Sequence, residues 1–380
     1  MNSSADFSPA LLLDAARFRG ELDGKPVALY TLRNSRGMVV CITNYGAKIE
    51  QMLVPGRDGQ LRDVVLGYDS LEAAVGGSAS MGAFIGRYAG RIGGAAFTLD
   101  GMRHQLTANN GPHCLHGGLR GSRFRVFDAV QRSDATVEMN CLFADGEEGF
   151  PGTLQLRLVY TVTEANELVL DYEATALDKP TVASFTTHAF FNLNGPSANS
   201  ESGDVRDHEV MICADSYFAA TDELVATGDI LPVAGTALDF RSPVLLRDRM
   251  QAAGSPALST EAAAAGVEQA AGVAGYDHCY LLNRANAQVL ALAARLSVGA
   301  NAPVMEVWST EPAMQFYTGL VAGERMPGAP GKSGHVYRQQ QSLCLEPQGY
   351  PNAPNCPGFP SAVHAPGLAR RATTVYRFTV

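Results

Sequence analysis

The chain has 380 residues, 46% of them apolar and 18% charged, which is the composition of a globular protein with a sizeable core. Its 38 Asp and Glu residues outnumber its 29 Lys and Arg residues and give a net charge of −9. An acidic surface disfavours binding to phosphate backbones and to anionic lipid. We therefore expect neither nucleic acid nor a membrane among the partners of this protein.

Apolar and polar residues alternate along several segments, which predicts β-strands with one buried face. In chain order these segments are 137–143, 154–163, 168–174 and 376–380. Asp-Gly pairs, which suit tight hairpin turns, separate runs of this kind. They begin at Asp23, Asp58, Asp100 and Asp145. With 39 glycines and 20 prolines as well, the chain is predicted to consist of many strands joined by turns.

Long amphipathic helices are scarce in the sequence. The strongest candidate is the Ala-rich stretch 252–274, which glycines and a proline interrupt, and we expect an irregular surface insertion with a helical turn or two. No linker divides the strand-rich pattern. We therefore predict an all-β fold: one large single-domain antiparallel β-sandwich over residues 17–380, preceded by an N-terminal extension at 1–16.

The cysteines and the N-terminus bear on the cellular location of the protein. Seven dispersed cysteines without a CxxC pair are typical of free thiols in a reducing environment. Residues 1–15 lack the basic start and long apolar run of a signal peptide, and no stretch reaches the length of a membrane span. We expect a cytoplasmic protein.

The sequence lacks a complete phosphate-binding loop, a complete zinc site and a serine nucleophile elbow. Gly331-Lys332-Ser333 matches the end of a phosphate-binding loop, but Met326 stands where the first glycine is required. His113 and His116 flank Cys114, yet no further ligands follow at a spacing that suits zinc. The sequence has no G-x-S-x-G nucleophile elbow. We expect no metal and no cofactor.

Polar residues gather instead in stretches rich in glycine, proline and asparagine. These stretches are 86–92, 109–118, 187–193, 275–278, 315–318 and 345–351. Each one alone has a structural explanation, because isolated His and Glu residues occur in any chain of this size. Their order along the chain is what carries information.

Together these stretches resemble the aldose 1-epimerase family, also called galactose mutarotases. The resemblance runs from Phe18 to the C-terminal strand and includes further matching segments, at 42–47, 63–68, 145–152, 233–236, 239–241, 310–312 and 351–355. Departures from the family pattern occur at Gly90, His113, Thr187 and in the segment 119–124, where a Phe and a Trp are usual.

The resemblance implies a galactose mutarotase-like supersandwich and an isomerase. Such an enzyme interconverts the α and β anomers of free aldohexoses such as glucose and galactose without a cofactor, and we expect a monomer or a homodimer. Anomer exchange needs a base at the C1 hydroxyl and an acid at the ring oxygen.

The resemblance also assigns the site residues. Glu346 is the base and His188 is the acid, which a neighbouring carboxylate would help to keep protonated. His116 is a further donor to the ring oxygen. Other sugar groups would be held by Arg91, Asp277, Gln315 and Phe191, although Phe191 suits a core position equally well. Arg87 is assigned a structural role.

Two other functions stay open at this point. A hexose 6-phosphate 1-epimerase would require a basic cluster for the phosphate, and acidic Asp277 argues against it. A non-catalytic carbohydrate-binding protein on the same fold would need neither an acid nor a base. A glycosidase is disfavoured, because it needs two carboxylates at the scissile bond, whereas one carboxylate and one His lead here.

Overall fold

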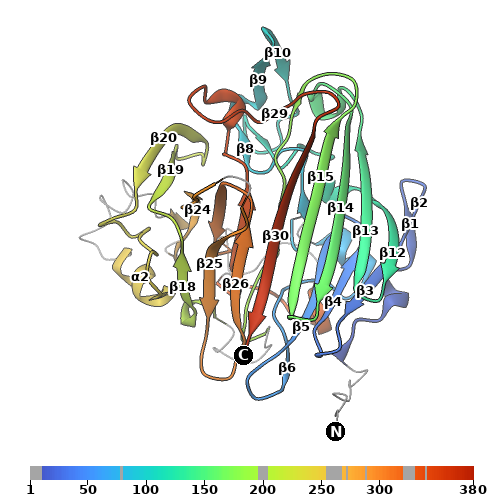
Figure 1. Cartoon of the computed structure of the whole chain (residues 1–380), viewed down its shortest axis with the longest axis vertical. Helices are drawn as coiled ribbons and strands as arrows, with labels where there is room; N and C mark the ends of the chain where they lie inside the picture. Colours follow the sequence, from blue (N-terminus) through green and yellow to red (C-terminus); the bar gives the residue numbers. More distant parts are fainter. Residues whose placement is uncertain are drawn as a thin grey trace.

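The computed structural model describes residues 11–77, 80–195, 204–253, 268–270, 273–286, 289–319, 330–338 and 340–380. Strands dominate it (Figure 1). The largest sheet has nine antiparallel strands. In spatial order they are β12 (Asp128–Ser133), β13 (Thr136–Phe143), β14 (Leu154–Thr163), β15 (Glu167–Ala176), β30 (Ala369–Thr379), β26 (Val304–Ser309), β25 (Ala291–Ser297), β18 (Glu209–Ile212) and β21 (Val244–Leu245).

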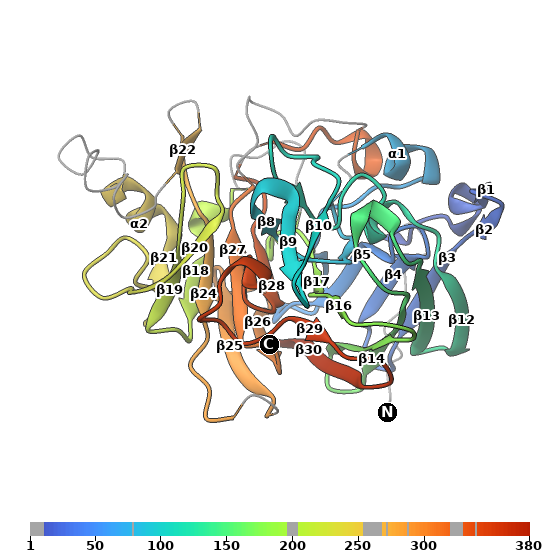
Figure 2. The ribbon, with the colours of Figure 1, turned by 90° about the horizontal axis from the view of Figure 1, so that it is seen from above.

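Two smaller antiparallel sheets face this long sheet. One has five strands: β20 (Ala226–Pro232), β19 (Ser216–Ala220), β24 (Asp277–Leu281), β27 (Ala313–Tyr317) and β28 (Cys344–Gln348). The other has four strands: β3 (Leu29–Arg33), β4 (Val39–Thr43), β5 (Lys48–Pro55) and β6 (Leu61–Asp63). In Figure 2, β4 and β5 lie on one side and β24, β27 and β28 on the other, all above β14 and β30. The predicted all-β sandwich is confirmed.

Short elements complete the described part of the chain. The two-stranded pairs are β1 (Gly20–Leu22) with β2 (Lys25–Val27), β7 (Phe84–Ile85) with β17 (Thr186–Thr187), β8 (Arg91–Ile92) with β11 (Cys114–Leu115), β9 (Ala96–Leu99) with β10 (Met102–Gln105), β16 (Thr181–Val182) with β29 (Val363–His364), and β22 (Glu268–Ala270) with β23 (Val273–Gly275). The α-helices are α1 (Leu71–Gly76) and α2 (Leu246–Ala253). The 3₁₀ turns are η2 (Ala15–Phe18), η3 (Gly93–Ala95), η4 (Ser122–Phe124), η5 (Glu147–Gly149), η7 (Val205–Asp207), η9 (Lys332–Gly334) and η10 (Ala353–Asn355).

Strand alternation and turn chemistry follow the sequence closely. On β14 every second residue from Leu154 to Val162 is buried. Asp23-Gly24 and Asp100-Gly101 form two-residue hairpins with positive φ at both positions, as the favoured hairpin turns require. Asp58-Gly59 connects β5 to β6, whereas Asp145-Gly146 lies in a longer connection between β13 and β14.

The main core fills the space between the long sheet and the two smaller sheets, and two tyrosines cross it. The Tyr160 hydroxyl on β14 donates a hydrogen bond to the Ala47 carbonyl oxygen at 2.9 Å, beside β5. The Tyr376 hydroxyl on β30 donates to the Leu345 carbonyl oxygen on β28 at 3.1 Å. Both tyrosines are fully buried, so these bonds join the layers from inside.

Several sequence expectations concern the edges of the chain. Leu12 and Leu13 pack beside Phe18, and the Leu13 amide donates to Gln51 on β5, so residues 11–16 are joined to the sandwich by contacts. Of the Ala-rich stretch, the end of α2 and the pair β22–β23 are described, while 254–267 and 271–272 lie outside the described residues. The cysteines and helices bear on two further expectations. All seven cysteines lie within the described residues, and all are free thiols. Neither α-helix in the described ranges has the length or hydropathy needed to cross a bilayer.

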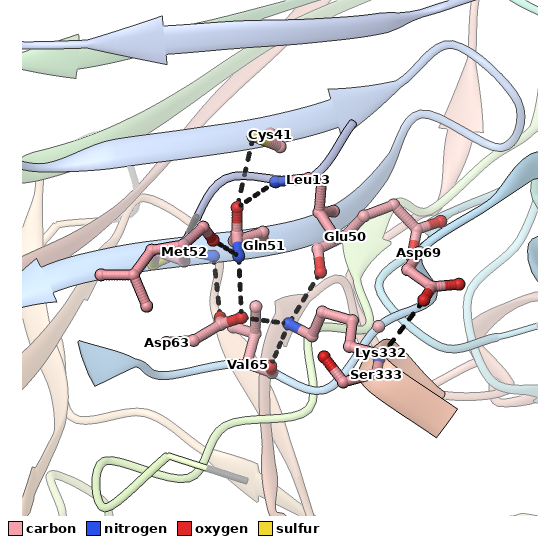
Figure 3. A network of polar contacts seen from close by, with 12 residues as sticks. Leu13, Cys41, Glu50, Gln51, Met52, Asp63, Val65, Asp69, Lys332 and Ser333 are labelled. Carbon is pink, nitrogen blue, oxygen red and sulfur yellow. Dashed lines mark hydrogen bonds and ion pairs between the residues drawn. The ribbon is translucent and has the colours of Figure 1, made fainter. Parts of the chain in front are cut away.

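Lys332, from the incomplete phosphate-loop motif, is buried in a polar network (Figure 3). Its ammonium donates to Asp63 Oδ2 at 2.6 Å and to the carbonyl oxygens of Glu50 and Val65 at 2.9 and 2.8 Å. Asp63 also accepts from the Met52 amide. All three protons of the ammonium are therefore used inside the protein, and the network ties the segment 330–338 to β5 and β6.

We predict that Lys332→Met lowers the free energy of unfolding by about 3 kcal/mol, because it leaves the Asp63 carboxylate without its cation in a largely buried position. The measurement is urea denaturation at pH 7. Lys179→Met is the matched control, since it breaks the exposed Lys179–Asp145 pair and should cost less than about 1 kcal/mol. Equal losses in the two variants would contradict the role assigned to Lys332.

Candidate active site

The register of β24, β27 and β28 gathers polar residues on one face of the five-stranded sheet. Gln315 on β27 lies directly opposite Glu346 on β28, and Asp277 on β24 lies opposite Tyr317 on β27. Because side chains alternate along a strand, these positions share one face. Gln315 Nε2 donates to Asp277 Oδ1 at 2.5 Å, which fixes both side chains. The Glu346 carboxylate itself is almost completely buried.

His188 reaches this face from β17. Its backbone is held on both sides, since the His188 amide donates to the Ala83 carbonyl oxygen at 2.8 Å and the Gly82 amide donates to the His188 carbonyl oxygen at 3.0 Å. The imidazole stacks on Phe190 with ring centroids 4.9 Å apart. Its Nε2 lies 3.6 Å from Glu346 Oε1. The imidazole is thus held by backbone and aromatic contacts with one nitrogen beside the carboxylate.

The other nitrogen of His188 contacts a thiol. Cys344 Sγ lies 3.4 Å from His188 Nδ1, and burial raises the pKa of this thiol well above its usual value. The thiol is therefore protonated and can donate to Nδ1. That bond favours the tautomer whose proton sits on Nε2, the nitrogen beside Glu346.

His116 and Arg91 come from the short pair β8–β11. Arg91 pairs with Leu115, so His116 follows directly with a φ of 55°. The Gly90 amide donates to His116 Nδ1 at 3.2 Å, which leaves Nε2 as the nitrogen that carries the proton. The His116 and His188 rings lie 5.7 Å apart, edge to face. Arg91 Nε donates to Asn110 Oδ1 at 2.8 Å.

Glycine is required beside His116. At Gly117 the φ is +79°, and a Cβ there would collide with the carbonyl oxygen of Gly86. The backbone around His116 therefore packs directly against the segment that leads into Arg87 and Arg91. This close approach explains the glycines after His116 in the sequence.

Burial disfavours charge on the central pair. It lowers the pKa of His188 to about 3, with the positive charge of Arg123 as a second cause. Burial also raises the pKa of Glu346 well above its usual value, and the negative charge of Asp277 adds to the rise. The expectation that a carboxylate keeps His188 protonated is therefore corrected: desolvation dominates and favours the neutral form of both groups.

Burial and neighbouring charges also set the pKa values of the surrounding residues. Burial lowers the pKa of His116 well below its usual value, and the positive charges of Arg123 and Arg91 lower it further. Burial raises the pKa of Asp277, and the charge of Arg91 opposes that rise. His116 is thus a neutral donor, and the positive charge of Arg91 acts on Asp277.

A metal could be considered only at the central group. One ligand atom each of His188, Cys344 and Glu346 lie within 4.8 Å of one another. Their donor atoms are already engaged with each other, and the thiol is protonated, whereas zinc binds the thiolate. The absence of a metal requirement stays a prediction.

The structure brings six of the predicted site residues together, namely Arg91, His116, His188, Asp277, Gln315 and Glu346. Phe191 is the exception. It is fully buried in the main core, with its ring 4.9 Å from Tyr376 on β30, because neighbouring residues point to opposite sides. The assignment of Phe191 to the sugar is therefore corrected, and Phe190 is the aromatic residue beside His188.

Arg87 has the structural role expected of it. Its Nη2 donates to the carbonyl oxygens of Pro151 and Gly152 and to Thr181 Oγ1. Four residues of the site were missed: Cys344, Phe190, Tyr317 and Arg123. Period-two spacing from Glu346, His188 and Gln315 could have found the first three, whereas nothing in the local pattern singles out Arg123.

Comparisons with known proteins agree over nearly the whole chain. The family model for aldose 1-epimerase matches residues 28–377. A galactose mutarotase from Rattus norvegicus is 36% identical over 95% of this chain and 97% of its own length. An aldose 1-epimerase from Escherichia coli is 34% identical over 94% of this chain and 96% of its own. A solved aldose epimerase homologue from C. elegans is 26% identical with a TM-score of 0.80, covering 93% of this chain and 99% of its own.

We predict that His188 stays neutral at pH 5, because its pKa is lowered to about 3 and lies below that pH. The measurement is a pH titration of imidazole nitrogen and carbon shifts by NMR. The signal is assigned by its loss in His188→Asn. A midpoint near 6.5 for the assigned signal would show that desolvation does not control this residue.

Proposed function

This chain belongs to the aldose 1-epimerase family, and from that premise we propose that Glu346 and His188 are the base and the acid with which it opens and recloses a sugar ring. The chain is an isomerase, a mutarotase that interconverts α and β anomers. The observation that supports the two roles is the 3.6 Å separation of His188 Nε2 and Glu346 Oε1 in a buried site, where desolvation shifts the pKa values of both groups toward their neutral forms.

Ring opening needs two proton transfers. Glu346 accepts the proton of the C1 hydroxyl while His188 Nε2 delivers a proton to the ring oxygen, and the bond between C1 and the ring oxygen breaks to give the open-chain aldehyde. Rotation about C1–C2 presents the other face of the carbonyl. Closure runs both transfers in reverse, so the enzyme ends with the protons it began with.

The cycle requires Glu346 as a carboxylate and His188 as an imidazolium, which together carry the same number of protons as the two neutral groups. In the tautomer that Cys344 favours, Nε2 of neutral His188 already carries a proton, so the second proton of the imidazolium enters at Nδ1, on the side of Cys344. Nε2 then delivers its proton to the ring oxygen. His116 Nε2–H supplies a further donor at the ring oxygen, since its Nδ1 is occupied by the Gly90 amide.

The remaining side chains would hold the sugar. Asp277 and Gln315 lie on the same sheet face as Glu346, and Arg91 provides the charge that balances Asp277. Charge-assisted hydrogen bonds from these groups suit sugar hydroxyls. Phe190 and Tyr317 surround His188 with aromatic rings. They would give the sugar ring an apolar wall.

The wider assignments are also proposals. We propose glucose and galactose as substrates, with support from relatives named galactose mutarotase. We propose a single domain over residues 17–380, a monomer or homodimer, and a cytoplasmic location, which seven free cysteines favour.

Glu346→Gln and His188→Asn should each lower kcat for anomer exchange by roughly 10²–10⁴-fold, the usual contribution of one positioned base or acid. The substrate affinity should fall much less, because Arg91, Asp277 and Gln315 remain. Polarimetry of freshly dissolved α-D-glucose and α-D-galactose gives the rates. The exposed Glu164→Gln is the matched control. A folded variant at either site with nearly full kcat would refute that residue's role.

Activity should survive exhaustive EDTA treatment and dialysis, because the proposed chemistry uses only protein side chains. The same polarimetric assay is run before and after treatment, with metal content checked by elemental analysis. The test matters because the donor atoms of His188, Cys344 and Glu346 lie close together. Loss of activity that a divalent ion restores would refute a metal-free mechanism.

A further inference from the structure

Arg123 lies between the two segments that carry the site histidines. It belongs to η4, which follows Gly121, and a Cβ on Gly121 would collide with the His116 carbonyl oxygen. Its Nη1 donates to Ser80 Oγ at 3.2 Å. Ser80 stands two residues before Gly82, whose amide donates to the His188 carbonyl oxygen. Backbone packing and a side-chain bond therefore place Arg123 beside both histidines.

The Arg123 guanidinium is buried and poorly satisfied. Only 8% of the residue is exposed, and its Nε is buried without a hydrogen-bond partner. Its bond to Ser80 is the single hydrogen bond of this guanidinium in the described part of the chain. Arg87 and Arg284 each make three hydrogen bonds, although the Nε of each and the Nη1 of Arg87 are likewise buried without a partner. One face of Arg123 rests on Phe124, with the guanidinium carbon 4.9 Å from the ring centroid.

No carboxylate among the described residues forms an ion pair with Arg123, whereas Arg125, two residues further along the chain, pairs with Glu147 at 2.6 Å. A buried cation without an anion is costly, and such a charge is usually paired. The arrangement suits an anion that comes from outside the chain.

The position of Arg123 indicates which part of a sugar it would meet. Gly121 packs against the His116 carbonyl oxygen, and Ser80, which accepts from Arg123, lies two residues before the Gly82 amide that donates to His188. The positive charge of Arg123 acts on both imidazoles. Arg123 is therefore on the histidine side of the site. In the proposed mechanism that is the side of the ring oxygen, and the carbon next to the ring oxygen, away from C1, carries the C6 substituent.

We propose that Arg123 is a specificity residue that binds an anionic group at C6 of the aldose, either the carboxylate of a uronic acid or a phosphate ester. This inference rests on the proposed function, which orients the sugar. A guanidinium offers paired donors that match both anions. A neutral hydroxymethyl group at C6 would leave the charge of Arg123 uncompensated. A single guanidinium balances a single carboxylate charge, so the uronic acid is the better match.

The test compares three sugars with wild type, Arg123→Gln and Arg123→Lys. The sugars are D-glucose, D-glucuronate and D-glucose 6-phosphate, and exchange between their anomers is followed by NMR at pH 7 and low salt. We expect the ratio of kcat/KM for glucuronate to that for glucose to fall about 10- to 100-fold in Arg123→Gln, the loss of a charge-assisted bond. Arg123→Lys, which keeps the charge without the paired donors, should lie in between.

Arg120→Gln is the matched control, because Arg120 is exposed in the same segment and its partner is Asp23 at 3.6 Å. Its ratio should equal that of wild type. A fall in the phosphate ratio alone in Arg123→Gln would identify a phosphate ester as the anion. Unchanged ratios for both anionic sugars would overturn the proposal.

A second measurement separates this proposal from the proposed function. Calorimetry of D-glucuronate binding is carried out with Glu346→Gln, with and without Arg123→Gln, so that no turnover is required. We expect affinity to fall about 10-fold or more when Arg123 is replaced. Wild-type turnover of glucose with affinity for glucuronate that does not depend on Arg123 would overturn this inference alone. Absence of glucose turnover would count against the proposed function instead.

Discussion

The site depends on the pairing register of β24, β27 and β28. Opposed positions in this register place Gln315 beside Glu346, and a slip by one residue would move every side chain to the other face. The register is held by the opposite face of the sheet, where Tyr280, Phe316 and Leu345 are buried in the main core. The same hydrophobic packing that stabilises the sandwich therefore sets the geometry of the polar face.

Burial then determines the chemistry of that face. Glu346, His188 and His116 are ionisable, and each is placed where a charge is poorly solvated. A low-dielectric environment disfavours a charge on Glu346 and on His188, so burial shifts the pKa values of both toward their neutral forms. The neighbours complete this arrangement: Cys344 selects a tautomer of His188, and the Gly90 amide selects one of His116.

Long regular elements were predictable from the sequence, and short ones were not. The alternation on β14 and the turns at Asp23 and Asp100 are local signals with a direct physical cause, and they were predicted correctly. The two-residue strands β7, β8, β11 and β17 are too short to show a period, although they position both histidines. The prediction that Phe191 contacts the sugar is wrong, because side chains alternate here: Phe190 stacks on His188, whereas Phe191 points into the core. The bond between Lys332 and Asp63 joins residues far apart in the chain, so no local sequence pattern could have predicted it.

In the proposed mechanism, catalysis and selectivity are divided between different parts of the chain. Glu346, Gln315 and Asp277 lie on paired strands whose register the core fixes. Arg123 lies on a short 3₁₀ turn in the connection between β11 and β12. Connections tolerate change more readily than core strands, so new side chains can enter a site there without disturbing its register. In our proposal a buried guanidinium supplied by such a segment determines which C6 substituent the site can neutralise, while the proton transfers at C1 and the ring oxygen are assigned to Glu346 on the sheet and to His188. The fold thus constrains the type of reaction more tightly than it constrains the choice of sugar substrate.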